Sequence, residues 1–154
     1  MKNILLTIML ALGAGAGAAT AQEYHQAPIT QGGNALTNAV AAQSTNGTAS
    51  DAIGLTKYGD VTLVLQYNLT GNTTFASNVV FSFAGSADGL SFSSTPPGGL
   101  VFTVPSNGTN TVTLVTNVTV GSLGYLELFS IGNSATNAAT NINVQAWVKP
   151  KRNG

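Results

Sequence analysis

Apolar and polar residues alternate along most of the chain from Lys57 onward. The clearest case is residues 61–69, in which every odd position is Val, Leu or Tyr and the even positions are mixed. A period of two places successive side chains on opposite faces of a β-strand, so one face of such a segment can enter a core. The same alternation predicts strands over residues 79–83, 90–92, 100–104, 111–120, 125–131 and 142–148.

Clusters of turn-forming residues separate these segments. They include Gly85 to Gly89, the Pro96-Pro97-Gly98-Gly99 run and Ser106-Asn107-Gly108. Short strands at spacings near 8–12 residues are typical of sandwiches and barrels. The sequence therefore predicts an all-β fold: a single antiparallel β-sandwich over residues 57–149 with about seven strands, either immunoglobulin-like or a jelly roll.

The N-terminal residues 1–21 have the organisation of a secretory signal peptide. Lys2 supplies a positive charge, residues 4–12 are a nearly unbroken apolar run, and Ala19-Thr20-Ala21 has the small-x-small pattern of a cleavage site. We expect cleavage after Ala21 and a secreted, periplasmic or cell-surface protein. An uncleaved membrane anchor is the alternative, but half of the span is Gly and Ala and no basic stop-transfer cluster follows. No membrane association is expected after cleavage.

Residues 22–56 differ from the rest of the chain. They are rich in Gln, Asn, Ala, Gly, Ser and Thr, and show no sustained period of two or 3.6. We interpret them as an extended or partly disordered arm with one strand near Pro28 to Thr30. Such an arm could find its partner on a neighbouring subunit. Residues 150–154 form a short basic tail.

The composition excludes several classes of function. There is no Cys, which excludes thiol chemistry and Cys-based metal sites, and only 6% of residues are charged. Removal of Lys2 leaves four basic against five acidic residues, a formal charge of −1. Nucleic-acid binding needs a basic face that this chain lacks. A surface with so few charges opposes association only weakly, which favours self-assembly into a homo-oligomer.

The titratable side chains are too scattered for catalysis. His25, the single histidine, lies in the arm, and a triad would need a Ser and an Asp brought to it by the fold. The carboxylates are isolated along the chain, so neither a carboxylate pair nor a metal site is predicted. Glu127 is expected on a strand, as an outward charge that discourages edge pairing. We therefore predict a non-enzymatic protein without cofactor or metal.

One hairpin has a recognisable motif. Residues 83–92 read F-x-x-S-x-D-G-x-x-F, in which Asp88 can accept backbone N–H groups after Ser86 and Gly89 can adopt a positive φ. With the closing Gln145 to Pro150 segment, this resembles small β-sandwich proteins encoded in bacteriophage and bacterial genomes. The resemblance covers roughly residues 57–150 and implies a subunit of a virion or surface structure.

Trp147 is the most informative single side chain. Alternation places it with Asn143 and Gln145 on the polar face of the last strand, where its ring can stack on a sugar while amides bind hydroxyl groups. Tyr125 is the second aromatic candidate. Alternatively, the arm, an edge strand or a neighbouring subunit covers this face. The predicted function is structural or surface assembly through protein–protein contacts, with a carbohydrate-binding module and a phage virion decoration protein as the alternatives.

Overall fold

The computed structural model describes most of the chain beyond the expected signal peptide. The described residues are 24–27, 29–31, 34–35, 39–47, 50–69, 77–94, 99–106, 111–119, 121 and 123–151. The expected signal peptide, residues 1–21, and the end of the basic tail, residues 152–154, lie outside them. No helix in the described part is long and apolar enough to cross a membrane.

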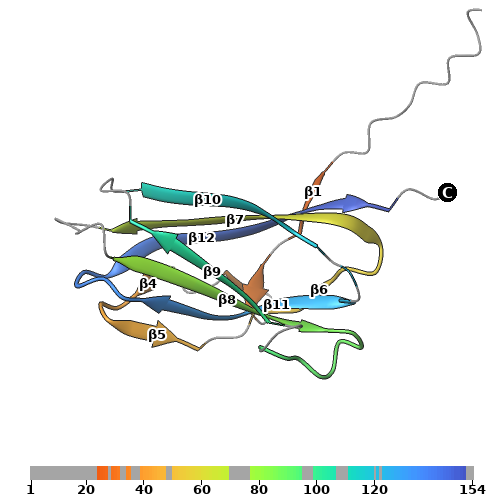
Figure 1. Ribbon diagram of the computed structural model, residues 1–154, viewed down its shortest axis with the longest axis horizontal. Helices are drawn as coiled ribbons and strands as arrows, with labels where there is room; N and C mark the ends of the chain where they lie inside the picture. The colour runs from red at the N-terminus through yellow and green to blue at the C-terminus, as the bar shows by residue number, and fades with distance from the viewer. Residues whose placement is uncertain are drawn as a thin grey trace, which may run out of the picture.

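Two five-stranded antiparallel sheets pack against each other (Figure 1). We call sheet 1 the sheet with the order β1-β12-β7-β10, in which β4 also pairs with β12. Its strands are β1 (His25–Ala27), β4 (Ala39–Val40), β7 (Tyr58–Leu69), β10 (Thr111–Val118) and β12 (Ala139–Pro150). Sheet 2 has the order β5-β11-β8-β9, in which β6 also pairs with β11. Its strands are β5 (Ser44–Asn46), β6 (Ile53–Gly54), β8 (Asn78–Ser86), β9 (Leu100–Pro105) and β11 (Tyr125–Asn133). A separate ladder joins β2 (Thr30–Gln31) to β3 (Asn34–Ala35). The predicted all-β sandwich is confirmed.

The order of the strands is that of a jelly roll. β1 and β4 share one edge of β12, and β5 and β6 share one edge of β11, so each couple fills one strand position. Numbered in chain order, the β1–β4 couple is strand 1, the β5–β6 couple is strand 2, and β7 to β12 are strands 3 to 8. The spatial order is then 1-8-3-6 in sheet 1 and 2-7-4-5 in sheet 2. An immunoglobulin-like sandwich keeps its last two strands in one sheet, whereas here β11 and β12 lie in different sheets. Of the two expected architectures, the jelly roll is the one that the connectivity shows.

The core lies between the two sheets and follows the predicted alternation. On β7 all of the odd positions from Val61 to Leu69 are buried, and the largest of them, Tyr67, is fully buried. Its hydroxyl donates a hydrogen bond to the Val104 carbonyl at 2.9 Å, so the polar atom of this buried side chain has a partner. From sheet 2, Phe83 packs edge-to-face on Phe102 with ring centroids 5.9 Å apart. Burial raises the pKa of Tyr67.

One expected strand, residues 90–92, is absent. These residues form a bend, and the side chain of Leu90 is 87% exposed. The cause is local, because Asp88 accepts the backbone N–H groups of Leu90 and Ser91 and so takes them away from any neighbouring strand. Only the isolated bridge between Gly85 and Ser93 closes the hairpin beyond them.

The segment interpreted as an arm, residues 22–56, supplies edge strands to both sheets. Gln26 of β1 lies opposite Trp147, and Ala39 and Val40 of β4 pair with the beginning of β12. β5 and β6 then pair with the two ends of β11. The described residues of this segment therefore cross from the edge of sheet 1 to the edge of sheet 2 within their own chain. Pairings of two or three residues are too short to leave a period of two in the sequence.

Candidate functional site

The outer face of sheet 1 carries a row of polar and aromatic side chains around Trp147. Gln26 of β1 and Thr62 of β7 are the register partners of Trp147, and Thr62 is also the partner of Asn117 on β10. We call these four residues the Trp147 row. It crosses four of the five strands of the sheet at one level, and Trp147 is half-buried within it. The alternation therefore predicted the face of Trp147 correctly.

Hydrogen bonds hold the side chains of this face in place. The Trp147 Nε1–H donates to Gln145 Oε1 at 3.1 Å, and the Thr62 hydroxyl donates to Asn117 Oδ1 at 2.8 Å. Asn143 lies on the same face, exposed, two residues before Gln145 and opposite Gln66 of β7. Trp147, Gln145 and Asn143 thus share one surface, as we expected. Because the Gln145 amide already holds the indole ring, the ring loses little further conformational entropy when a ligand binds to it.

A hollow of about 290 Å³ opens at one end of the Trp147 row. We call it the Tyr24 hollow. Its lining residues are Tyr24, Gly59, Asp60, Val61, Asn117, Val118 and Thr119. The Lys149 Nζ lies 5.6 Å from the centroid of the Tyr24 ring, a cation–π distance, and Lys149 is the register partner of Asp60. Aromatic, amide, hydroxyl and carboxylate groups therefore meet on one small surface.

Tyr24, Asp60 and Asn117 belong to this surface although the sequence pattern did not indicate them. Tyr24 lay in the segment interpreted as an arm, and Asp60 stands just before the predicted strand 61–69, although β7 begins two residues earlier at Tyr58. One signal was available, since Tyr24 and Gln26 are two residues apart and so belong to one face of a short strand. Nothing in the sequence indicates that this strand pairs with residues 146–148.

The structure does not bring Tyr125 to Trp147. Tyr125 lies on β11 of sheet 2, opposite Ser86 of β8 and Gly54 of β6. Its ring rests against Gly89 of the 86–91 turn, so close that a Cβ on this glycine would lie 2.9 Å from Tyr125 Cε2. In this position Tyr125 supports the turn on sheet 2, and the Trp147 row has Tyr24 as its neighbouring aromatic residue instead.

The turn residues Ser86, Asp88 and Gly89 form a closed set of hydrogen bonds. Asp88 Oδ1 accepts the N–H groups of Ser91 and Leu90, both at 2.9 Å, and the Ser86 hydroxyl at 2.8 Å. These bonds, with the Ser91 and Leu90 amides first, lower the pKa of Asp88 to about 2. Gly89 has a φ of 77° and donates its N–H to Ser86 Oγ at 2.9 Å. The carboxylate is thus engaged by its own turn.

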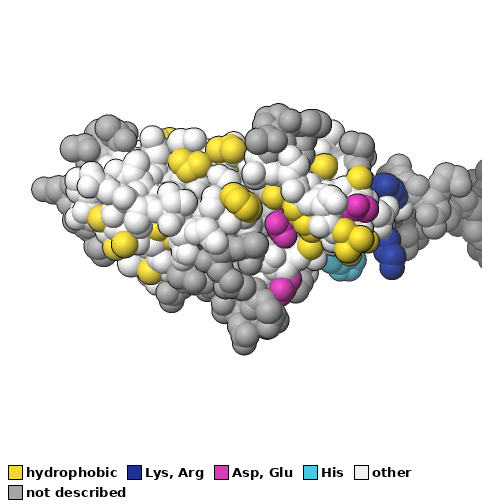
Figure 2. Space-filling view, turned by 90° about the horizontal axis from the view of Figure 1, so that it is seen from below, with side chains coloured by type: hydrophobic (Ala, Val, Ile, Leu, Met, Phe, Trp, Pro, Cys, Tyr) yellow, Lys and Arg dark blue, Asp and Glu magenta, His cyan; other side chains and the backbone are white. Residues whose placement is uncertain are grey.

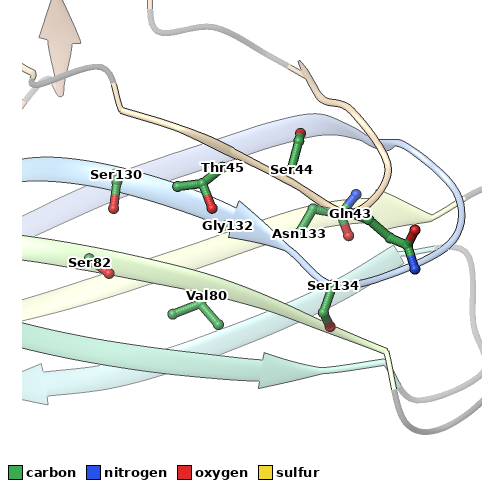
Figure 3. Close-up of a pocket in the computed structure, with 9 residues that line it drawn as sticks. All are labelled: Gln43, Ser44, Thr45, Val80, Ser82, Ser130, Gly132, Asn133 and Ser134. Atoms are coloured by element: carbon green, nitrogen blue, oxygen red, sulfur yellow. The ribbon is translucent and has the colours of Figure 1, made fainter.

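A second hollow, of about 570 Å³, lies on the outer face of sheet 2 (Figure 3). It is open above Gly132, which has no side chain to fill the space between Thr45 and Val80. Figure 3 shows hydroxyl groups around it on β5, β8 and β11. The lining residues are Gln43, Ser44, Thr45, Val80, Ser82, Ser130, Gly132, Asn133 and Ser134. No aromatic residue is among them.

Asn133 at the end of this second hollow has a structural role. It is 3% exposed, and its Nδ2 donates to the carbonyl groups of Val40, Ala41 and Asn137. Its Oδ1 accepts the N–H of Ala135 at 2.9 Å. The side chain of Asn133 therefore ties β4 to the loop between β11 and β12 and has little capacity left for a ligand.

The charged side chains are few and stand apart. Figure 2 shows this on the sheet 2 side, where white atoms of the backbone and of uncharged polar side chains predominate and the few charged groups are separate from one another. Within the described part of the chain, no three His, Asp or Glu residues lie close enough to hold a metal ion. Glu127 lies on a strand and faces outward, as expected, but β11 lies between β8 and the β5–β6 couple, so its expected role at a sheet edge was wrong. Partial burial there raises the pKa of Glu127.

The fold and these surfaces define a charge-poor jelly-roll β-sandwich with a polar, aromatic outer face. Comparison with protein-family models, with curated proteins and with solved structures gives no match to this chain.

Proposed function

We propose that this protein is a non-enzymatic structural subunit that assembles with copies of itself by joining sheet edges at β10. The observation that carries the proposal is the composition of this edge strand. β10 is eight residues long, pairs with β7 on one side, and contains only Thr, Val, Leu and Asn. Natural proteins usually protect such an edge with charges, prolines or short length, because its unpaired backbone groups are a template for another strand. β10 has none of these protections.

The two flanks of the sandwich differ in a way that supports this proposal. On one flank the N-terminal segment covers both sheets, since β1 and β4 pair with β12 and β5 and β6 pair with β11. On the other flank β10 and β9 are the last strands of their sheets among the described residues (Figure 1). β9 is shorter and ends at Pro105, which cannot donate to a new ladder. The longer, proline-free edge of β10 is therefore the better site for strand addition.

Exposed apolar side chains gather on the same flank. Val115 of β10 is 62% exposed and Val101 of β9 is 61% exposed. Each lies on the outer face of its sheet beside the open edge, opposite Val64 and Ser82 respectively. Apolar groups next to unpaired backbone add burial to the hydrogen bonds that a second strand would form.

A second copy of the chain is the partner that this edge suits best. An uncharged strand offers nothing to attract a charged partner, whereas an antiparallel strand can pair with its own copy about a two-fold axis. The low charge of the whole chain weakens repulsion between copies. The expected export signal and the resemblance to virion and surface proteins agree with an assembly that functions outside the cytoplasm.

Light scattering behind size-exclusion chromatography, at several protein concentrations, tests the proposal. We expect dimers or larger species whose share rises with concentration. Val115→Lys, which places a charge beside the edge, should shift the protein to monomer at every concentration. Leu90→Lys is the matched control, because it makes the same change at a residue that is 87% exposed in the 86–91 turn, and it should assemble as the wild type does. A wild-type monomer throughout, or equal assembly of Val115→Lys, would contradict the proposal.

A further inference from the structure

We infer that the Tyr24 hollow and the Trp147 row together form a binding site for an uncharged carbohydrate chain. The site lies on the outer face of sheet 1 and includes Asn117 of β10, whereas the proposed assembly uses the backbone edge of that strand. The inference therefore goes beyond the proposed function and does not depend on it.

Two aromatic side chains provide the apolar part of this site. Tyr24 is 45% exposed and lines the hollow, and Trp147 is half-buried and pairs with Gln26, two residues after Tyr24. The apolar C–H groups of a sugar ring pack against the flat faces of such rings. Lys149 over the Tyr24 ring and Gln145 at the indole Nε1 hold both rings in position.

The polar groups match the hydroxyl groups of a sugar. Asp60, exposed at the hollow, has acceptor oxygens only, and the amide Nδ2 of Asn117 is a donor. Asn117 Oδ1 is already held by the Thr62 hydroxyl, which fixes the plane of the amide. A sugar hydroxyl both donates and accepts, so neighbouring hydroxyl groups can bond to Asp60 and Asn117 together. An apolar ligand would leave these groups without partners.

The charges and the shape of the site select the ligand class. Lys149 stands opposite Asp60 in the register, so the two charges offset each other and favour an uncharged ligand over a nucleic acid or an acidic glycan. The Trp147 row crosses three strand spacings, a length of roughly 14 Å. A hollow of about 290 Å³ at the end of such a row suits one sugar unit with its neighbours along the row. This shape favours an oligosaccharide over a compact metabolite.

Trp147 is the only tryptophan of the chain, so intrinsic fluorescence reports directly on this face. The purified protein would be titrated with neutral hexasaccharides of glucose (β-1,4 and β-1,3 linked), N-acetylglucosamine, mannose and xylose, and with an acidic oligogalacturonate. Calorimetry on the same samples would give the affinities. We expect at least one neutral oligosaccharide to bind and to change the emission of Trp147, and to bind more tightly than the acidic one.

Variants then locate the ligand. Tyr24→Ala and Asp60→Asn should each weaken binding by about tenfold or more, the loss that about 1.4 kcal/mol produces. Tyr24→Phe keeps the ring and should bind within about twofold of the wild type, which separates a lost contact from a lost fold. Ser82→Ala changes the hollow on sheet 2 and should have no effect on binding.

The inference is overturned if no oligosaccharide binds, if the acidic one is preferred, or if Tyr24→Ala and Asp60→Asn bind as the wild type does. Val115→Lys, tested alongside, should bind whether or not it assembles, so failure of the assembly proposal and failure of this one are distinguishable.

Discussion

Ser50 forms hydrogen bonds with both backbone polar groups of Leu128. The Ser50 N–H donates to the Leu128 carbonyl at 2.8 Å, and the Leu128 N–H donates to Ser50 Oγ at 2.9 Å. Leu128 lies on β11 between the residues that pair with β6 and those that pair with β5. A single serine therefore replaces a strand residue there and closes the edge of sheet 2, with its side chain in the place of a backbone carbonyl.

Replacing this serine tests how much the closure stabilises the fold. Ser50 is 6% exposed, so Ser50→Ala leaves the Leu128 N–H buried without an acceptor. We expect the free energy of unfolding to fall by about 1–3 kcal/mol, measured by chemical denaturation. Ser82→Ala, on the outer face of the same sheet, is the control and should change it by less than about 0.5 kcal/mol. Equal stability of the two variants would show that Ser50 is dispensable.

Gly89 is expected to tolerate no side chain. Its φ of 77° disfavours L-residues, and a Cβ there would lie 2.9 Å from the Tyr125 ring. Gly89→Ala should therefore lower the free energy of unfolding by at least about 1–2 kcal/mol. Gly47→Ala is the matched control, because a Cβ at Gly47 meets no atom within 4 Å. Thermal unfolding of both variants would decide the point, and a Gly89→Ala protein as stable as Gly47→Ala would contradict this account of the turn.

The Asp88 turn makes stability depend on pH in the acid range. The pKa of Asp88 is lowered to about 2 in the folded protein, below its ordinary value of 3.8. The folded state therefore binds this proton less readily than the unfolded state, so the carboxylate stabilises the fold above about pH 4. That contribution should fade as the pH drops from about 4 to about 2.

The comparison with Asp88→Asn isolates this contribution. An asparagine cannot ionise, so the difference in denaturant midpoint between wild type and variant should shrink from pH 5 toward pH 2. Subtracting the two curves of denaturant midpoint against pH cancels the contribution of Glu127, because both proteins contain it. The raised pKa of Glu127 makes stability change with pH in the opposite direction. A difference that stays constant over this range would show that the Asp88 charge does not contribute to the turn.

The sequence was sufficient for the sandwich but not for its connectivity. The alternation over 61–69 and 142–148 follows from the burial of one face of each strand, and this is a local property of the chain. The choice between an immunoglobulin-like fold and a jelly roll depends on whether β12 pairs with β11, its neighbour in sequence, or with the distant β7. The alternation within a strand does not tell these two partners apart. Only one of the N-terminal strands was expected, near Pro28 to Thr30, because each of them has only two or three residues.

For the candidate site, as for the fold, the sequence predicted which side chains share a face of one strand but not which strands lie side by side. Alternation placed Trp147, Gln145 and Asn143 on one face, and the structure keeps them there. Tyr125 was assigned to the same site because sequence gives no means of telling the two sheets apart. Tyr24 was missed because only the pairing of β1 with β12 brings it beside Lys149 and the Trp147 row, and the sequence does not show this pairing.

The most direct test of the central claim uses cysteine crosslinking, because the chain has no cysteine of its own. Single cysteines would be placed at Thr113, Val115 and Asn117 along the outer face of β10, and at Asn143 on β12 as the control. In a two-fold antiparallel pairing, residues near the axis face their own copies at Cα distances of about 4.5–5.5 Å, which a disulfide can bridge. We expect mild oxidation to give a covalent dimer at one of the β10 positions and none at Asn143. Absence of the dimer at every β10 position, or equal dimer at Asn143, would contradict assembly through this edge.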